Sequence, residues 1–471
     1  MRSDACDIQR AVLRRLLTEG ARTAFGHDHS ITASMTAEQF AAAVPVRDYD
    51  ASRPYIDRVL AGQSDVLRPG RTLRFAKSSG TTSDRSKYIP VTRESLRESH
   101  LRGMYDVAAM YAAMRPSTRV FDGKTLTLGG SLSTVGGITS GDLSALALDG
   151  SSRLGDMIRT PRRSTALMEN FDDKAAAICR ECTLERVTSF AGVPSWNLVL
   201  MRRILEYTGR SNLLEVWPDL ELFVHGGMGF APYRAAYAQL LPDASFAYME
   251  TYNASEGFFA MADDLSRDDM LLMPDYGAYY EFRSRSGDVC PLCGVRSGER
   301  YALIITSCNG LWRYDTGDVV EFTSTDPYRI RLAGRTRQFI NAFGEELAAD
   351  NAEKALSAAC RATGASVGEY TAAPIYMSLS SCGAHEWAIE FLQAPPSLDE
   401  FASALDSELR RLNSDYDAKR TTALGRPVVR SLPRGTFIGW LHSCGKNKVP
   451  HLCNDRTIIE SLQAPDRRHK N

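Results

Sequence analysis

Short apolar runs alternate with amphipathic stretches through most of the chain. Thr92 can cap one long helix, because apolar residues recur after it at helical spacing until Pro116 ends the pattern. The strand-length runs cover residues 125–128, 187–190, 220–224, 245–249, 301–306 and 319–322. This alternation predicts an α/β fold with largely buried sheets, and it places ligands in the loops that follow the strands.

The pattern restarts beyond residues 334–337 as a smaller α+β unit. Ser397 and Glu400 form a capping box that opens an amphipathic helix. The other predicted elements of this unit are a strand over residues 385–392 and a last helix over residues 455–462. Because single cores stop growing near about 250–300 residues, we expect this chain of 471 residues to form two domains, 1–335 and 336–471.

The charge of the chain is balanced, with 56 Lys and Arg against 57 Asp and Glu. Nothing in this balance favours a nucleic-acid or anionic-membrane partner. The first residues form no apolar signal core, and no apolar run approaches the length of a bilayer span. We therefore expect a soluble cytoplasmic protein, a monomer with a dimer as the alternative.

Ten cysteines are scattered at irregular spacings. Cys179 with Cys182 and Cys290 with Cys293 form two C-x-x-C pairs, so a four-ligand zinc site is one interpretation. The pairs lie over a hundred residues apart, and the first falls in a helical stretch. Reduced thiols are therefore the expected state.

A polar loop over residues 77–87 separates two short apolar runs. It combines hydroxyls, one glycine and flanking cations, which together can wrap a polyphosphate. It is not a Walker loop, since G-x-x-x-x-G-K-[ST] is missing from the sequence. An ordinary surface turn remains the alternative for this loop taken alone.

Three further loops carry chemistry of the same kind. Glu256 stands among hydroxyl and amide groups, where a carboxylate can hold Mg²⁺ that bridges phosphates. Gly226 and Gly227 follow a predicted strand, so backbone could approach a flat ring there. Asp318 follows a glycine at the start of a strand and could accept two ribose hydroxyl protons. Each signal is weak alone, but their order along the chain favours a nucleotide site.

These segments resemble the ATP-dependent adenylating superfamily of acyl-CoA synthetases, peptide-synthetase adenylation domains and luciferases. Within it, the chain looks like the acyl acid amido synthetases of the auxin-responsive Gretchen Hagen family, in a bacterial-type form. The matching segments span nearly the whole chain: 44–46, 54–56, 141–144, 192–196, 217–218, 252–257, 334–336, 341–345, 385–387, 413–416 and 448–450. The resemblance implies a large adenylate-forming α/β domain with mixed β-sheets flanked by helices, and a small mobile α+β domain.

The resemblance also implies a role for individual residues. The residues matched to ATP binding are Ser78, Ser79, Gly80, Thr81, Thr82, Gly226, Gly227, Tyr252, Asn253, Ala254, Ser255, Asp318 and Arg335. Glu256 matches the magnesium carboxylate, and Lys448 matches the mobile catalytic lysine of the second domain. The acyl and amine pocket is expected to include Met104, Tyr105, Val193, Trp196 and Phe230, which plain core packing would explain equally well.

Two motifs depart from the family pattern. The third motif usually reads Tyr-Arg-x-Gly-Asp, but Asp315 takes the second place, with Arg313 two residues earlier. In the last motif His451 follows Pro450 where the family has arginine, and Lys446 remains a rival of Lys448. These departures concern the placement of charge.

The implied reaction uses ATP and Mg²⁺ to convert a carboxylic acid into an acyl-adenylate. An amine, most simply an amino acid, then attacks the adenylate to give an amide and AMP. Two alternatives stay open: thioester formation with coenzyme A or a carrier thiol, and a nucleotide-binding sensor that has lost catalysis. The sequence identifies neither the acid, nor the amine, nor the base that deprotonates the amine.

Overall fold

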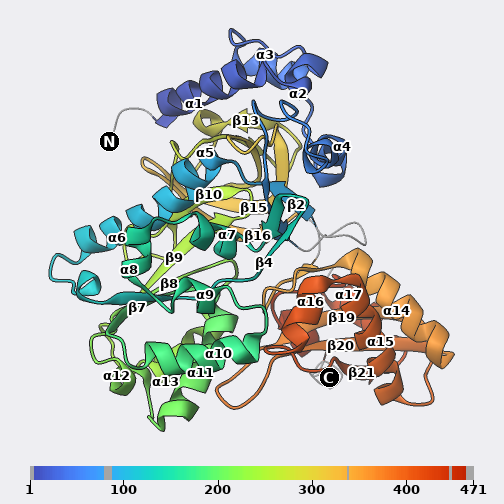
Figure 1. Ribbon diagram of the computed structural model, residues 1–471. Coiled ribbons are helices and arrows are strands. Elements are labelled where there is room, and N and C mark those ends of the chain that lie inside the picture. Colours follow the sequence, from blue (N-terminus) through green and yellow to red (C-terminus); the bar gives the residue numbers. More distant parts are fainter. Residues whose placement is uncertain (1–4, 79–86, 337–338, 445–447, 463–471) are drawn as a thin grey trace.

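The computed structural model describes residues 5–78, 87–336, 339–444 and 448–462. A mixed sheet forms its centre (Figure 1). Its strands are, in spatial order, β13 (Val289–Pro291), β12 (Ala278–Arg283), β14 (Arg300–Ser307), β15 (Tyr314–Thr325), β16 (Tyr328–Arg335), β11 (Met270–Leu272), β10 (Gly257–Met261), β9 (Ala247–Ala254), β8 (Leu222–Gly226), β7 (Val187–Gly192), β3 (Lys124–Thr127) and β6 (Arg159–Thr160). The predicted α/β class is confirmed.

The sheet changes direction at β9. Strands β6, β3, β7, β8 and β9 are parallel, whereas β10 pairs antiparallel with β9. Buried rings fill the parallel half, where Phe223 stacks on Phe190 at 4.3 Å and on Tyr237 at 4.9 Å between ring centroids. The helices α10 (Phe171–Cys182), α11 (Pro194–Thr208) and α13 (Arg234–Leu240) belong to this half. Because the strands are parallel, their carboxyl ends meet at one edge.

The first helices cover the antiparallel half of the sheet (Figure 1). They are α1 (Ala5–Gly20), α2 (Ala24–Asp28), α3 (Ala37–Ala43) and α4 (Tyr49–Leu60). Gln9 of α1 is buried, and its amide donates to the carbonyls of Pro274 and Ala278 while it accepts from Tyr280 N. A separate small sheet follows, in the order β2 (Lys87–Pro90), β1 (Arg74–Ser78), β5 (Ile138–Gly141), β4 (Leu132–Val135).

The helix that Thr92 caps is interrupted. It consists of α5 (Arg93–Ser95), a π-helical stretch (Leu96–Leu101) and α6 (Arg102–Met114). The Thr92 hydroxyl accepts from Ser95 N at 3.0 Å, so the predicted cap is confirmed. In the π-helical stretch Ser99 Oγ accepts from Phe258 N at 2.9 Å, a contact with β10 that the apolar spacing could not predict.

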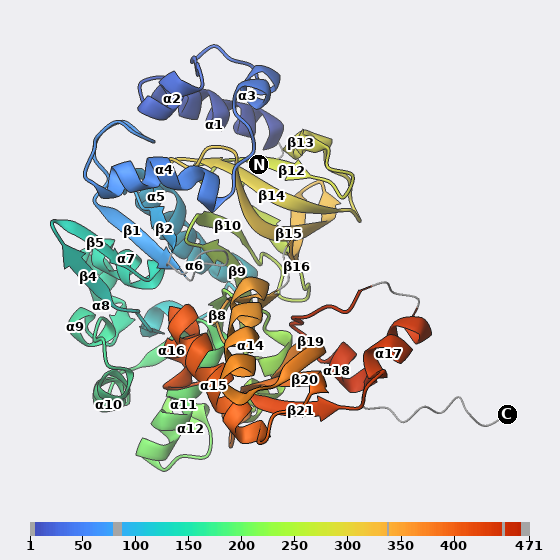
Figure 2. The same cartoon turned by 90° about the vertical axis from the view of Figure 1, so that its right-hand side faces the viewer.

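The second unit begins after β16. Its strands are β17 (Phe339–Ile340), β18 (Leu347–Ala348), β19 (Ser366–Ile375), β20 (Ala384–Gln393) and β21 (Val428–Leu432). Its helices are α14 (Ala349–Thr363), α15 (Leu398–Leu412), α16 (Ser414–Arg420), α17 (Thr436–Cys444) and α18 (Thr457–Ser461). Figure 2 shows α14, α15 and α16 on one side of β19–β20–β21, with α17 and α18 on the other.

One buried cluster runs through both units. It joins Phe223 and Tyr233 of the first unit to Phe343, Trp387 and Leu405 of the second. The division at residues 335 and 336 stays a prediction, although the chain does leave the large sheet at Arg335, the last residue of β16.

The cysteines differ from the prediction at one pair. Cys6 of α1 and Cys293 form a disulfide, so the expectation of reduced thiols is wrong for these two. The eight others are free thiols. Within the described ranges, no three His, Cys, Asp or Glu side chains gather as metal ligands, and Cys293 of the second C-x-x-C pair is bonded to Cys6. No helix there is long and apolar enough to span a bilayer.

Candidate active site

Several of the predicted site residues lie where the parallel strands end. Gly226 ends β8, and a Cβ there would lie 2.4 Å from the carbonyl oxygen of Thr251 in β9, so only glycine fits. Gly227 has a φ of +81°, which also favours glycine, and it faces Val193 after β7. These glycines keep the backbone at the sheet edge free of side chains, as a flat ring would require.

Asp318 of β15 binds side chains from two other strands. Tyr252 Oη of β9 donates to Asp318 Oδ2 at 2.5 Å, and Arg335 Nε of β16 donates to Asp318 Oδ1 at 2.8 Å. Arg335 also donates to Glu346 at 3.2 Å, beyond the last strand of the large sheet. Burial, and then the charge of Asp318, raises the pKa of Tyr252, which keeps the phenol a donor. The motif residues Tyr252, Asp318 and Arg335 are thus brought together.

Glu256 lies in the turn between β9 and β10 and is half-buried. Burial raises its pKa to about 7, and the carboxylate of Asp318 adds to the rise, whereas Lys87 and Arg335 oppose it. Glu256 therefore lies in the field of one carboxylate, Asp318, and two cations, Lys87 and Arg335. A group that titrates near neutral pH at such a place is a candidate for function.

Lys87 connects this cluster to the predicted phosphate loop. Ser78 ends β1 and pairs with Lys87, the first residue of β2. Ser79, Gly80, Thr81 and Thr82 lie outside the described residues, so their role stays a prediction. In the sequence, Lys87 is only one of the cations that flank the loop. Its electrostatic effect on Glu256 is a long-range contact that no local pattern signals.

Asn253 is held by a residue that sequence reasoning missed. Burial lowers the pKa of His100 to about 4, so the ring is neutral and its Nδ1 donates to Asn253 Oδ1 at 2.9 Å. A lone histidine in a helical pattern gives no signal of such a contact. Ala254, the last residue of β9, and Ser255 in the turn that follows are partly exposed, as the predicted nucleotide contact requires.

The third-motif departure has a structural explanation. Arg313 is buried and forms two hydrogen bonds of 2.9 Å with the Glu281 carboxylate, and it donates to the carbonyls of Ala41 and Val44 at 2.7 Å. Asp315 is bound by Arg283. The ion pairs Arg313–Glu281 and Arg283–Asp315 therefore hold β12 to β15, and Arg313 also binds the end of α3. Asp318 is the carboxylate of the third motif that lies at the site.

The predicted pocket residues divide into two groups. Phe230 is buried and stacks on His225 at 4.2 Å, and Trp196 is half-buried and lies 4.9 Å from Phe171 between ring centroids. Met104 and Tyr105 are 43% and 51% exposed on α6. Tyr105 lines an outer hollow with residues such as Arg102 and Asp275, and the place of Met104 and Tyr105 in the pocket stays a prediction.

The segment after Arg335 lies on the same edge of the sheet. Ser195 Oγ donates to Phe343 O at 3.0 Å, Tyr233 Oη donates to Ala342 O, and Asn341 Nδ2 donates to Gly227 O at 3.4 Å. The buried Glu345 carboxylate accepts from Ala342 N, Phe343 N and His385 and thereby fixes this turn. The matched segment 341–345 thus seats the second unit against the loops after β7 and β8.

Lys448 is exposed. The next residue, Val449, packs in a buried cluster with Phe437 of α17 and Ile459 of α18, on the side of β19–β20–β21 away from α16. His451, which replaces the family's arginine, bonds to Glu369 at 2.8 Å and stacks on Tyr370 within the second unit. Lys446 lies outside the described residues. Among the described residues, no contact joins Lys448 to Asp318 or Glu256.

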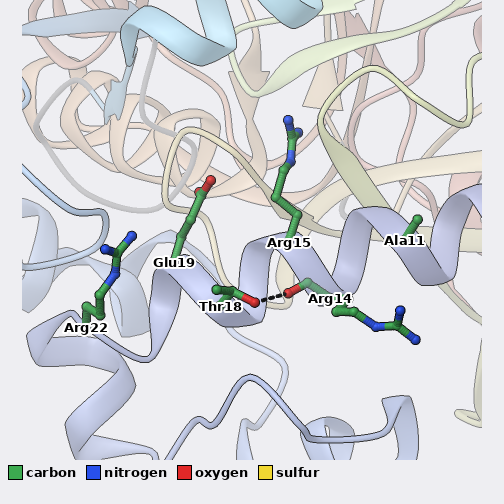
Figure 3. Close-up of a pocket in the computed structure, with 6 residues that line it drawn as sticks. All are labelled: Ala11, Arg14, Arg15, Thr18, Glu19 and Arg22. Carbon is green, nitrogen blue, oxygen red and sulfur yellow. Dashed lines mark hydrogen bonds between the residues drawn. The ribbon is translucent and has the colours of Figure 1, made fainter.

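Another hollow runs along α1, far from these strand ends in the sequence. Its lining residues are Ala11, Arg14, Arg15, Thr18, Glu19 and Arg22 (Figure 3). Thr18 Oγ1 donates to Arg14 O, Arg15 pairs with Glu98 at 2.6 Å, and Glu19 pairs with Arg68. This hollow shares no residue with the cluster around Asp318, and its charges serve the packing of α1.

Family models match three stretches of the chain. They are the GH3 family N-terminal domain over residues 1–179, the GH3 family central domain over 271–335 and the GH3 family C-terminal domain over 350–457. The chain belongs to the GH3 family. GH3 is the Gretchen Hagen family that the motifs resembled, so the sequence-based assignment is confirmed.

Curated GH3 relatives align over nearly the whole chain. Indole-3-acetic acid-amido synthetase GH3.10 of Arabidopsis thaliana is 23% identical over 98% of this chain and 94% of its own length. Indole-3-acetic acid-amido synthetase GH3.8 of Oryza sativa subsp. indica is 24% identical over 97% of this chain and 90% of its own.

Solved structures share the GH3 fold. The AtGH3.15 acyl acid amido synthetase in complex with 2,4-DB superposes with a TM-score of 0.64 at 18% identity, covering 98% of this chain and 94% of its own. 2-Hydroxyisobutyryl-CoA ligase superposes with a TM-score of 0.61 at 16% identity, covering 98% and 93%. At such identity the likeness establishes the adenylate-forming fold alone.

Proposed function

We propose that this GH3 protein is an AMP-forming acyl acid amido synthetase, which activates a carboxylic acid with ATP and transfers the acyl group to an amine. The observation that carries the proposal is the convergence of Asp318, Glu256, Arg335 and Lys87 at the end of β9. Four separate segments supply these charges, and the motifs of the GH3 family name three of the residues, Asp318, Glu256 and Arg335. The curated relatives are amido synthetases by name, which supports the amide as product.

In the first step a carboxylate oxygen attacks the α-phosphorus of ATP in line, and pyrophosphate leaves. Asp318 would accept the ribose hydroxyl protons, since a carboxylate has lone pairs beyond those used by Tyr252 and Arg335. Residues 78–82 and Lys87 would hold the phosphates. Catalysis then consists of positioning and electrostatic stabilisation of charge on the non-bridging oxygens.

The residues present fit a magnesium ion. Glu256 is a half-buried carboxylate whose ionisation is opposed by burial and by Asp318, and a cation there would favour its charged form. Mg²⁺ in proteins often takes one or two carboxylates and completes its shell with phosphates and water. Bound to Glu256, it would neutralise the charge of the leaving pyrophosphate.

The second unit would serve the two steps in turn. Lys448 would stabilise the α-phosphate during adenylation, and for this the unit must turn about the chain after Arg335. The amine then attacks the acyl carbon, the amide bond forms, and AMP leaves with the former carboxylate oxygen. The pocket for the acid would include Val193, Trp196 and Phe230. The cytoplasmic location and the monomeric state stay predictions.

Acid-dependent exchange of labelled pyrophosphate into ATP tests the first step, with a panel of aromatic and medium-chain acids. We expect exchange with at least one acid, and with that acid an amide product when amino acids are added. ATP binding without any exchange would support the sensor instead. Exchange followed by transfer to coenzyme A, and not to amines, would support a thioester-forming ligase.

A further inference from the structure

His225 is a buried histidine near the carboxyl end of β8 whose ring nitrogens have no partner in the protein. The residue is 4% exposed, and in the part of the chain that the structure describes no hydrogen bond reaches either nitrogen. The two other histidines buried there differ. His100 Nδ1 donates to Asn253, and His385 Nε2 binds Glu345. A phenyl ring would fill the place of His225 without burying polar atoms, so the imidazole indicates a ligand with a polar group.

The contacts of the His225 ring fix its orientation. It stacks on Phe230 at 4.2 Å between ring centroids, and Phe223 lies at 5.3 Å. The His225 carbonyl accepts from Thr251 Oγ1 at 3.1 Å, which holds the backbone as well. Stacking uses the face of the ring and leaves its edge, with the nitrogens, for hydrogen bonds. The ring therefore keeps this edge in one direction.

The two ring nitrogens have different surroundings. Nδ1 is enclosed by the protein and unpaired, so a ligand would meet the ring at Nε2. Burial, and then Arg234, lowers the pKa of His225 to about 3, and the ring is therefore neutral, with a proton on only one nitrogen. A buried N–H without an acceptor is rarer in proteins than a buried acceptor without a donor. The proton thus belongs on Nε2, which makes this nitrogen a hydrogen-bond donor.

The space beside His225 leads toward the pocket proposed for the acid. The strand β8 lies between β7 and β9 (Figure 1), and His225 is in register with Gly192 of β7 and Glu250 of β9. Gly192 carries no side chain, so it leaves room beside the imidazole on the β7 side. The next residue, Val193, and the stacked Phe230 both belong to the proposed pocket.

The nucleotide is expected on the other side of β9. In the order of the sheet, β9 separates β8 from β10 and from β15, which carries Asp318, and Glu256 lies in the turn between β9 and β10. His225 is therefore displaced from the expected ribose position toward β7. The rings around it form an apolar wall, which favours an uncharged substituent over an ionic one.

We infer that His225 donates from Nε2 to an oxygen substituent on the acid, which is a hydroxyl, ether or keto group. The inference rests on the proposed function and names the class of acid for it. A site that forms a hydrogen bond with a substrate group rejects the analogue that lacks the group, because its own polar atom is then left unpaired. The enzyme should therefore prefer oxygen-substituted acids to hydrocarbon acids of the same shape.

The test measures kcat/KM for acids of matched shape in pyrophosphate exchange. The pairs are 4-hydroxyphenylacetate with 4-methylphenylacetate, 4-methoxyphenylacetate with 4-ethylphenylacetate, and 6-hydroxyhexanoate with heptanoate. We expect the parent to prefer the oxygen-containing acid in at least one pair, and His225→Phe to lower that preference about 10-fold to 100-fold. His225→Gln, whose amide can donate, should keep part of the preference. The KM for ATP should stay unchanged, and His442→Gln, at an exposed histidine, is the control.

Three results obtained with exchange intact would overturn the inference. The parent could show no preference in any pair, which decides the matter even if His225→Phe does not fold. The preference could be the same in the parent and in His225→Phe. The variant could raise the KM for ATP equally with every acid, which would place His225 on the nucleotide. Absence of exchange in the parent with every acid is a separate result, since it would defeat the proposed function and the inference with it.

Discussion

Asp318 has two roles at the residue scale, because one carboxylate binds Tyr252 and Arg335 and is expected to bind ribose. Asp318→Asn should raise the KM for ATP about 10-fold or more, as loss of charge-assisted hydrogen bonds of about 1.5–3 kcal/mol implies. The parent should discriminate against 2′-deoxy-ATP, and the variant should not. Tyr252→Phe, which removes one neighbour only, is the control. Equal discrimination in parent and Asp318→Asn would remove the ribose role.

Glu256 should oppose stability and support activity. Folding raises the pKa of Glu256 from 4.5 to about 7, so the folded state binds one more proton than the unfolded state between these pH values. The free energy of unfolding therefore falls as the pH rises through this window. Glu256→Gln removes the cost of burying the charge and should raise the free energy of unfolding by about 1–3 kcal/mol at pH 8 in EDTA.

The same Glu256→Gln variant should exchange pyrophosphate slowly and need more Mg²⁺, since an amide is a poorer ligand for a hard cation. Urea unfolding and a magnesium titration of exchange measure the two effects. A normal magnesium titration would give Glu256 a structural role.

Buried neutral histidines should make the protein sensitive to acid. Burial, and then Arg234, lowers the pKa of His225 from 6.5 to about 3, so the unfolded state binds more protons below pH 6.5 and stability is lost as the pH falls. Between pH 7.5 and 5.5 His225 alone should cost about 1.4 kcal/mol. His225→Phe keeps the stack on Phe230. In urea unfolding at the two pH values, the variant should lose about 1.4 kcal/mol less of its free energy of unfolding than the parent does. An identical loss in parent and variant would contradict this.

At the same scale, motif residues were predictable and their neighbours were not. Glu256 and Asp318 stand in segments whose order along the chain is distinctive. His100 and Lys87 act on the site through contacts with residues far away in sequence, which periodicity and spacing do not encode. The apolar character of Met104 and Tyr105 does not distinguish an exposed helix face from the wall of a pocket.

At the scale of elements, Thr92 caps its helix and also binds that helix to the segment after β14 of the large sheet. Thr92 accepts from Ser95 N and donates to Cys308 O, both at 3.0 Å, and is buried. Thr92→Ala should therefore lower the free energy of unfolding by about 1–2 kcal/mol, whereas Thr92→Ser keeps the hydroxyl and most of the stability. Urea midpoints measure the difference. Equal midpoints for the alanine and serine variants would show that the cap contributes little.

Strands were predictable because their apolar runs are short and bounded by polar turns. The run at 220–224 corresponds to β8, shifted by two residues at each end, and the other runs also fall on strands. The pairing was not predictable, since the change from parallel to antiparallel at β9 depends on which strands become neighbours. The π-helical stretch depends likewise on a contact with Phe258.

At the scale of the whole molecule, the reaction needs the second unit in two positions. Lys448→Ala should lower pyrophosphate exchange at least about 100-fold, as for one charge contact made in the transition state, with little loss of nucleotide affinity. Transfer from pre-formed acyl-adenylate should be much less affected. Lys446→Ala is the matched variant from the same loop. If it shows this pattern and Lys448→Ala does not, the catalytic lysine is Lys446.

The central claim is that the acid is activated as an adenylate and ends as an amide. The most direct measurement uses the acid that supports exchange, labelled with ¹⁸O in its carboxylate, with ATP, Mg²⁺ and an amino acid, followed by mass spectrometry of all products. The account predicts one ¹⁸O in AMP, one ¹⁸O in the carbonyl of the amide and none in pyrophosphate, because the attacking carboxylate oxygen stays on the α-phosphorus when the amine displaces it. ADP with labelled inorganic phosphate, or AMP without label, would contradict it.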